Sequence, residues 1–302
     1  MASSANFLAS KLFSVKGLVA FVTGGGTGIG LMATQALAAN GARVYITGRR
    51  QEVLDNVVKT YGSGVDGEII ALPGDVTQKD DLKRLAEEIK KREGGLHILV
   101  NNAGIAGPKT KIDKEKSLED LSAELFGEEQ SAWEDVFRTN VQNIFFTTMA
   151  FLPLLQKFTF GGDAAGRAIY EKYQSVVINT TSISGLVKSA QNHFAYNASK
   201  GAANHLQRLL ATEFAHTGVR FNSIAPGVFP SEMTGESADE NNKVSLEGNF
   251  DPKSLNVPAN RGGTDEDMGG TFLYLASRAG QYTSGVILPV DGGTLQTNPS
   301  AY

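Results

Sequence analysis

A tyrosine and a lysine four residues apart, Tyr196 and Lys200, are the pair of side chains in this sequence best suited to proton transfer. The segment around them has helical spacing, so both side chains lie on one face, one turn apart. A free phenol has a pKa near ~10, and an adjacent ammonium lowers that pKa. Tyr196 can therefore act as a general acid toward a carbonyl or as a general base toward an alcohol. A serine-rich run that includes Ser182 and Ser184 lies a little upstream and supplies hydroxyls for the same site.

The glycine-rich segment at residues 23–30, which reads T-G-G-G-T-G-I-G, is the second feature with a chemical use. It follows the apolar run 18–22 and precedes a helical pattern, as in a strand, a tight turn and a helix start. The N-terminus of such a helix presents free N–H groups and the positive end of the helix dipole, which suit a pyrophosphate. Here Gly24 turns the chain, Gly28 lets the backbone approach the phosphates, and Gly30 lets the helix pack closely. The segment therefore predicts a dinucleotide-binding site.

The elements that position these residues follow from alternating apolar runs and helical patterns. Short runs rich in Val and Ile alternate with helix-length stretches, as in a parallel sheet covered on both faces. We expect one α/β domain over residues 1–302, a doubly wound Rossmann-type fold with a seven-stranded, mostly parallel sheet. The expected strands are 19–22, 43–47, 68–73, 98–101, 175–179, 219–224 and 286–290, and the expected helices include 80–92, 133–156, 198–217 and 266–277.

Three segments are longer or more polar than such a sheet requires: residues 105–131, 158–174 and 229–261. Loops of this length in a compact domain are usually lids, interface elements or insertions. Ligands in this fold lie outside the carboxyl ends of the strands, so 105–131, 185–194 and 229–261 are the candidate walls of a substrate site. We assign 229–261 as a substrate loop that closes over the ligand, and 1–15 as an N-terminal extension.

Composition and charge exclude several other classes of protein. The 302 residues carry a net charge of −4 with scattered Lys and Arg, so no basic stripe indicates nucleic acid. The chain has no Cys and four isolated His residues, which leaves no ligand spacing for a metal. No apolar run approaches the ~20 residues that cross a bilayer. These features predict a soluble, cytoplasmic protein that acts on a small molecule, with no nucleic-acid, membrane or metal partner.

The sequence strongly resembles the short-chain dehydrogenase/reductase family over nearly its whole length, from about residue 12 to residue 293. In that family the residue that matches Ser182 hydrogen-bonds the substrate oxygen, and the residue that matches Tyr196 moves the proton. The resemblance further implies that Lys200 also holds the nicotinamide ribose, and that Asn140 holds a water in a proton relay behind the lysine. The matching motifs, in the family's order, are T-G-G-G-T-G-I-G at 23–30, Asp75-Val76, N-N-A-G at 101–104, Asn140, Ser182, Tyr196 with Lys200, Pro226-Gly227 and V-D-G-G at 290–293.

One departure from the family pattern concerns the serine. Ser182 lies fourteen residues before Tyr196, one more than expected, so Ser184 stays open as an alternative. The resemblance also implies a set of coenzyme contacts, in which Asp75 matches the adenine-binding acid and Pro226-Gly227 matches the loop near the nicotinamide amide. The expected coenzyme-binding residues are Gly24, Thr27, Gly28, Ile29, Gly30, Arg49, Asp75, Val76, Asn102, Ala103, Gly104, Tyr196, Lys200, Pro226, Gly227 and Val228.

The residues after the second expected strand indicate which coenzyme binds. An NAD site places a carboxylate there for the adenosine ribose hydroxyls, whereas the 2′-phosphate of NADP(H) needs cations. The sequence has Gly48 in place of that acid, followed by Arg49 and Arg50. It favours NADP(H), with Arg49 as the phosphate partner and Arg50 or Thr47 as weaker or alternative partners. The alternative is that both arginines are surface charges at the start of the next helix.

Together these features predict an NADPH-dependent carbonyl reductase that interconverts a ketone and a secondary alcohol. The other function considered is that of a coenzyme-binding protein of the same fold, recruited to a scaffolding, regulatory or non-redox role. The intact set of Asn140, Ser182, Tyr196 and Lys200 argues against that second function. No charged cluster or aromatic stripe in the candidate loops singles out a particular ketone.

Candidate substrate contacts are Ser184, His193 and Phe229, and segment 226–234 resembles gluconate 5-dehydrogenases and 3-oxoacyl reductases. The family resemblance also places helices 133–156 and 198–217 in a subunit interface. We therefore expect a homo-oligomer, a tetramer or a dimer. The apolar set that supports this expectation is more than one exposed helix should show, and it comprises Phe145, Phe146, Met149, Phe151 and Leu152.

Overall fold

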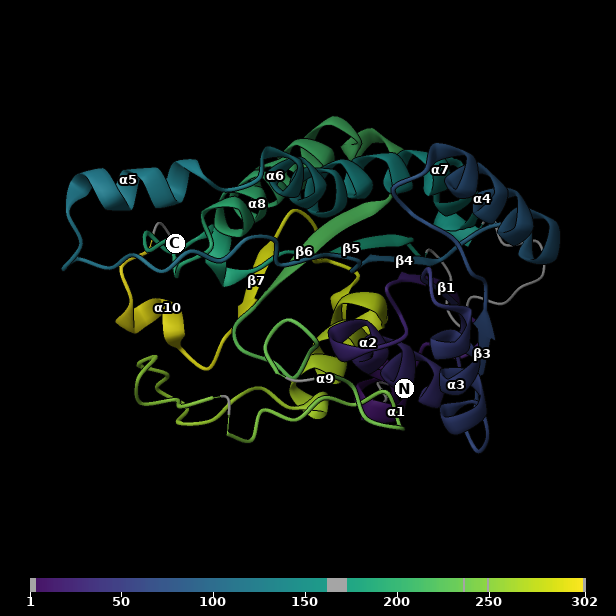
Figure 1. Cartoon of the computed structure of the whole chain (residues 1–302). Coiled ribbons are helices and arrows are strands. Elements are labelled where there is room, and N and C mark those ends of the chain that lie inside the picture. Colours follow the sequence, from purple (N-terminus) through teal and green to yellow (C-terminus); the bar gives the residue numbers. More distant parts are fainter. Residues whose placement is uncertain (1–3, 162–172, 236, 249, 301–302) are drawn as a thin grey trace.

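One seven-stranded sheet runs through the part of the chain that the structure, a computed structural model, describes: residues 4–161, 173–235, 237–248 and 250–300. Its strand order is β3-β2-β1-β4-β5-β6-β7, and each neighbouring pair is parallel (Figure 1). This confirms the expected doubly wound fold. The strands are β1 (Val19–Thr23), β2 (Arg43–Thr47), β3 (Glu68–Ala71), β4 (Ile98–Asn101), β5 (Val176–Thr180), β6 (Arg220–Pro226) and β7 (Ile287–Val290).

Helices cover both faces of the sheet, which explains why its central strands are buried throughout and largely apolar (Figure 1). On one face α2 (Gly28–Ala39), α3 (Gln51–Tyr61) and α9 (Asp265–Ala276) enclose a core of buried apolar residues. On the other face α4 (Lys79–Glu93), α7 (Asn143–Phe158) and α8 (Phe194–Glu213) enclose a second core. Shorter helices are α1 (Ala9–Leu12), α5 (Leu118–Phe126), α6 (Gln130–Phe137) and α10 (Thr294–Thr297), with 3-10 turns at Ser4–Phe7, Thr159–Gly161, Ile183–Gly185, Ala215–Thr217 and Arg278–Gly280.

The continuous helix expected over 133–156 is interrupted. A π-helical turn at Arg138–Gln142 separates α6 from α7 and contains the buried Asn140. The Asn140 amide exchanges two hydrogen bonds of 2.9 Å with the backbone of Ile105, and the wider turn lets the amide reach that distant strand end. The helix expected to start at 198 starts at Phe194, which places Tyr196 in its first turn.

The long segments differ in structure. Segment 105–131 contains α5, which projects from the body of the molecule and buries none of its residues (Figure 1). Its Leu118 and Phe126 are 85% and 92% exposed. The described part of segment 229–261 contains no helix or strand. Most of segment 158–174 lies outside the described residues.

The apolar set on α7 lies only partly on the surface. Phe151 is buried and stacks on Phe21 at 4.6 Å, and Phe146 lies beneath the ammonium of Lys79. Only Phe145 of the set is classed as exposed, at 38%. The apolar face expected on this helix is therefore partly exposed, since Phe146, Met149 and Leu152 are half-buried. In the described ranges, no helix combines the length and apolar character that crossing a membrane requires, and no cluster of potential metal ligands occurs.

Candidate active site

The glycine turn links β1 to α2 where the strand order reverses, since β1 lies between β2 and β4. Gly24 and Gly28 have positive φ angles of 64° and 53°, which disfavour any other residue. A Cβ on Gly30 would lie 2.0 Å from the Gly24 carbonyl oxygen, so close packing requires that glycine. The residue before α2, Thr27, provides no side-chain cap, so the first N–H groups of the helix are left for an anion.

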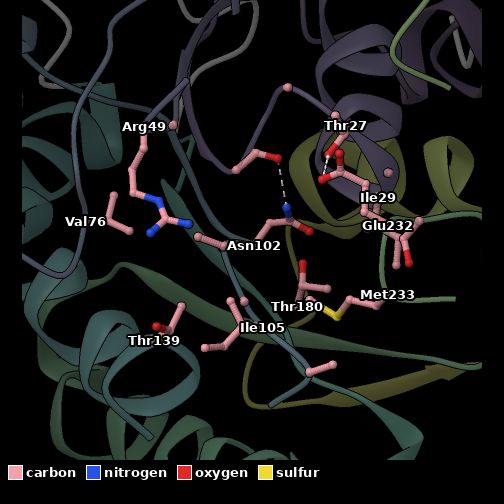
Figure 2. Close-up of a pocket in the computed structure, with 18 of the residues that line it drawn as sticks. Thr27, Ile29, Arg49, Val76, Asn102, Ile105, Thr139, Thr180, Glu232 and Met233 are labelled. Carbon is pink, nitrogen blue, oxygen red and sulfur yellow. Dashed lines mark hydrogen bonds between the residues drawn. The ribbon is translucent and has the colours of Figure 1, made fainter. Parts of the chain in front are cut away.

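The end of β4 is fixed against the same turn. The Thr23 hydroxyl accepts hydrogen bonds from the backbone N–H groups of Asn102 and Ala103, at 2.9 and 3.0 Å. The Asn102 amide donates in return to the carbonyl oxygens of Thr23 and Gly24, each at 3.2 Å (Figure 2). The two neighbouring strand ends therefore form a rigid floor made largely of backbone and small residues.

A cavity of about 970 Å³ opens above this floor. Gly30 does not line this cavity, and its role is to let α2 pack closely on the glycine turn. Val228 lines a separate cavity of about 180 Å³, because the backbone after β6 turns its side chain away and its carbonyl accepts from Gly263 at 2.9 Å. The other expected coenzyme residues all line the large cavity: Gly24, Thr27, Gly28, Ile29, Arg49, Asp75, Val76, Asn102, Ala103, Gly104, Tyr196, Lys200, Pro226 and Gly227.

The two arginines after β2 differ in their surroundings. Arg49 points into the cavity (Figure 2), and within the described residues no ion pair involving it is found. Arg50 is paired instead with Glu232, at 2.9 Å. Thr47, the other alternative phosphate partner, lines the cavity but is fully buried. Arg49 is therefore the cation that the structure leaves available to a ligand at this rim.

The three residues expected to carry the reaction, Ser182, Tyr196 and Lys200, lie together at the other end of the cavity. Burial raises the pKa of Tyr196, and a hydrogen bond with the Ser182 hydroxyl offsets part of that increase. Burial lowers the pKa of Lys200 to about 8, and its Nζ donates to the Thr180 carbonyl at 3.0 Å. Nζ lies 5.6 Å from the centre of the Tyr196 ring. The expectation that Lys200 lowers the pKa of Tyr196 is wrong for this structure, because burial dominates.

Asn140 lies behind these residues and does not line the cavity. Both N–H groups of its amide donate within the protein, to the Ile105 carbonyl and to the Ser199 hydroxyl at 3.0 Å. Ser199 in turn donates to the Tyr196 carbonyl at 2.7 Å. The geometry makes Asn140 a positioning residue that connects the end of β4 to the first turn of α8.

Of the two candidate serines, only Ser182 lines the cavity. The Ser184 hydroxyl donates to the Gln191 side chain at 2.8 Å, and the Ser184 backbone N–H donates to the Ser182 hydroxyl at 3.0 Å. Ser184 therefore orients Ser182 and does not face the ligand. This geometry favours Ser182 as the serine of the site.

His193 and Phe229, the other candidate substrate contacts, both line the cavity. The His193 ring lies 6.3 Å from the ring of Tyr196, and burial lowers its pKa, with a further decrease from Lys109. A histidine held neutral in this position can donate or accept a hydrogen bond from a polar substrate. Phe229 is almost fully buried, and its ring packs against Gly263, where a Cβ would lie 2.2 Å from it. Phe229 is therefore part of the wall and not of a moving lid.

Several cavity residues were missed by the sequence analysis. Residues 231–233 directly follow the Pro226-Gly227 motif at the carboxyl end of β6, where ligands of this fold bind, so that rule could have found them. The others come from segment 105–131, from the π-helical turn and from the end of β5, and no motif marks them individually. The missed residues include Ile105, Lys109, Thr139, Thr180, Ser231, Glu232 and Met233.

Comparison with known proteins agrees with this geometry. The family model for short chain dehydrogenases matches residues 18–242. PhomF, a short-chain dehydrogenase/reductase of Diaporthe leptostromiformis, is 42% identical over 298 residues, which cover 98% of each protein. A 3-oxoacyl-(acyl-carrier-protein) reductase of rhamnolipids biosynthesis from Pseudomonas aeruginosa is 34% identical over 93% of this chain and 97% of that protein. The solved Pseudomonas aeruginosa RhlG/NADP active-site complex has a TM-score of 0.76 and 32% identity, and covers 94% of this chain and 98% of that chain.

These similarities extend over nearly the whole chain, and the range that the family model matches spans the segments that form the floor and the reactive end of the cavity. Gluconate 5-dehydrogenase is also a relative, so the expected resemblance to that enzyme and to 3-oxoacyl reductases is confirmed. The sequence motifs, the parallel sheet and the matched residues all lead to the same assignment. The chain belongs to the short-chain dehydrogenase/reductase family of oxidoreductases.

Proposed function

We propose that this protein is an NADPH-dependent carbonyl reductase that converts a ketone to a secondary alcohol and catalyses the reverse oxidation. The observation that supports the proposal best is a single cavity. The glycine turn and Arg49 line one end of it, and Ser182, Tyr196 and Lys200 line the other. A dinucleotide bound along this cavity would bring its reactive ring to the hydroxyl groups that can exchange a proton with a substrate oxygen.

The residues fit NADP(H) at three points. The glycine cradle and the uncapped start of α2 suit the pyrophosphate, and Arg49 suits the 2′-phosphate. The solved RhlG complex, which contains NADP, supports the same coenzyme. When bound, the nicotinamide supplies the hydride that the carbonyl carbon accepts. Lys200, whose Nζ faces the cavity, would hold the ribose.

Side chains of the protein carry out the proton transfer. Ser182 donates a hydrogen bond to the carbonyl oxygen, which polarises the carbonyl and stabilises the charge that develops on that oxygen. Tyr196 then donates its phenolic proton to the same oxygen and completes the alcohol. A phenol with a raised pKa is protonated at neutral pH, as a proton donor for ketone reduction must be.

The coenzyme is tested by measuring the dissociation constants of NADPH and NADH for the wild type and for Arg49→Ala. One charged hydrogen bond contributes ~1.5–3 kcal/mol, so NADPH should bind about tenfold to hundredfold more weakly in this variant. NADH binding should stay nearly unchanged. Gly48→Asp should invert the preference, since its carboxylate repels the phosphate and accepts from the ribose hydroxyls. Equal losses for both coenzymes, or a wild type that prefers NADH, would contradict the proposal.

The reaction is tested with a panel of ketones and secondary alcohols and both coenzymes. Consumption of NADPH with a ketone supports the reductase, and binding of NADPH without turnover of any panel member supports the scaffolding or non-redox alternative. The 3-oxoacyl and gluconate relatives make acyl ketones and keto sugars the first candidates. Mass spectrometry of small molecules retained through purification extends the panel.

The proposal includes a cytoplasmic enzyme that assembles with itself. Exposed apolar side chains on adjacent helices support the assembly: Phe145 on α7, and Phe194 and Leu209 on α8. Light scattering at micromolar concentration should therefore give a multiple of the 32.1 kDa chain mass. A monomer mass would contradict this part of the proposal and leave the chemistry unaffected.

A further inference from the structure

A carboxylate of the protein itself lies at the arginine rim of the coenzyme cavity. Glu232, from the segment after β6, forms a bidentate ion pair with Arg50, with N–O distances of 2.9 and 3.2 Å. One of its oxygens also accepts a hydrogen bond from the Thr27 hydroxyl at 3.4 Å (Figure 2). The pair joins residues 182 positions apart in the sequence, so the fold and not local propensity creates it.

The groups around Glu232 are ones that could also bind an anionic ligand. Thr27 directly precedes α2, whose first N–H groups are uncapped, and Arg50 directly follows Arg49. The preceding residue, Ser231, packs on the glycine turn, where a Cβ on Gly28 would lie 3.0 Å from its own Cβ. The Glu232 carboxylate is therefore held against two donors at the same rim where Arg49 is free to meet a phosphate.

We propose that Glu232 is a specificity-determining residue, an internal anion that occupies Arg50 and opposes the 2′-phosphate of NADPH. The inference rests on the proposed function, since it concerns how strongly that coenzyme is preferred. Glu232 neutralises one of the two adjacent arginines, and its own charge repels a phosphate bound nearby. NADH lacks the 2′-phosphate, so it gains nothing from Arg50 and shares with NADPH only the repulsion that reaches the pyrophosphate beside Thr27. Glu232 thereby reduces the difference between the two affinities.

The ion pair can be displaced, because it is exposed. The side chains of Arg50 and Glu232 are 53% and 37% accessible, and pairs of this kind are weak and salt-screened. A doubly charged phosphate can therefore compete for Arg50, although it does so against the carboxylate. In the described part of the chain no carboxylate pairs with Arg49, so Arg49 is the main phosphate ligand. Arg50 becomes available to the phosphate only when its ion pair with Glu232 breaks.

The test compares the dissociation constants of NADPH and NADH in the wild type and in Glu232→Gln, a substitution of nearly equal size. We expect NADPH to bind about three- to tenfold more tightly in the variant, because one repulsive charge is lost and Arg50 is released. NADH should change by less than about twofold. The gain for NADPH should decrease as salt is raised from low to physiological concentration.

Two further variants make the result specific. Glu240→Gln removes the same charge from the same segment at an exposed position, and it should leave the ratio of the two affinities unchanged. In an Arg50→Ala background, Glu232→Gln should yield a smaller NADPH gain, because no arginine is left to release. Melting temperatures of all variants identify any loss of folding. Weaker NADPH binding in Glu232→Gln, or equal changes for both coenzymes, would overturn the proposal. Glu232 would then have only the structural role of holding its segment against Arg50.

Failure of this inference can be told apart from failure of the proposed coenzyme. A wild type that prefers NADH overturns the coenzyme proposal, whereas the Glu232 inference is judged only by how the NADPH to NADH ratio changes on substitution. Binding of 2′-AMP and 5′-AMP gives a second reading without the nicotinamide. Only 2′-AMP should bind more tightly to Glu232→Gln, and an equal gain for 5′-AMP would show a general charge effect and overturn the inference.

Discussion

The coenzyme end and the substrate end of the cavity are built in different ways. At the coenzyme end, β1, α2 and β4 fix each position through sheet register and through contacts that only glycine permits. At the substrate end, segment 105–131 depends on a few side-chain contacts between distant parts of the chain, such as the one between Ile105 and Asn140. Local motifs can therefore reveal the coenzyme end, whereas the choice of substrate depends on contacts that no short motif contains.

The largest expected effect removes the reaction and leaves the coenzyme end intact. Tyr196→Phe deletes one hydroxyl from a buried ring, so turnover should fall by about 10²–10⁴-fold while NADPH affinity stays the same. Steady-state kinetics and a coenzyme titration measure the two quantities. Tyr282→Phe, which deletes the same group from a fully exposed ring, is the matched control and should behave as wild type. Near-normal turnover in Tyr196→Phe would refute the assigned proton donor.

A second prediction concerns the glycine turn at the coenzyme end of the cavity. Gly30→Ala puts a methyl group 2.0 Å from the Gly24 carbonyl oxygen, so the turn must shift. We expect at least about a tenfold loss of affinity for both coenzymes and a decrease of ~1–3 kcal/mol in the free energy of unfolding. Gly270→Ala, at an open and exposed position in α9, should raise that free energy by up to ~1 kcal/mol. Denaturant titrations check both values, and equal stability of the two variants would contradict the packing argument.

A smaller effect should follow from pH. The pKa of Lys200 is lowered to about 8 by burial, so its ammonium loses a proton as pH rises through that value. NADPH affinity should then decrease about tenfold between pH 7 and 9, since one charged hydrogen bond to the ribose is lost. Fluorescence titration of NADPH measures this change. Tyr196→Phe should keep the profile and Lys200→Met should flatten it, while a flat profile in the wild type would argue against the lysine.

The same lowered pKa has a consequence for stability. Between about 8 and the ordinary value of 10.5, the folded protein binds fewer protons at Lys200 than the unfolded chain does. The contribution of this group to stability therefore rises with pH across that window, and below pH 8 the cost of burying the ammonium is fully present. Lys200→Met should unfold at a higher denaturant concentration than wild type at pH 7, and the difference should shrink toward pH 10.

Most of the fold could be predicted because burial on both faces makes the strands of a parallel sheet continuously apolar. The glycine turn could also be predicted, since its members are adjacent in sequence, and the family resemblance named Ser182, Tyr196 and Lys200, which line one cavity. The π-helical turn could not, because it depends on Asn140 meeting Ile105 across the fold. The position of Val228 depends on which way one loop residue faces. The pairing of Arg50 with Glu232 depends on the path of a segment without periodicity.

Asn242 anchors segment 229–261 at its middle. Its amide donates to the carbonyl oxygens of Gly26 and Val53, at 3.0 and 2.9 Å, and so anchors the middle of segment 229–261 to the coenzyme end. While Asn242 stays anchored, the part of the segment on either side of it can open alone. Each such opening involves fewer residues than opening of the whole segment. We expect the part that carries Glu232 and the part beyond Asn242 to open separately, so Asn242→Ala should merge two rates of amide hydrogen exchange into one.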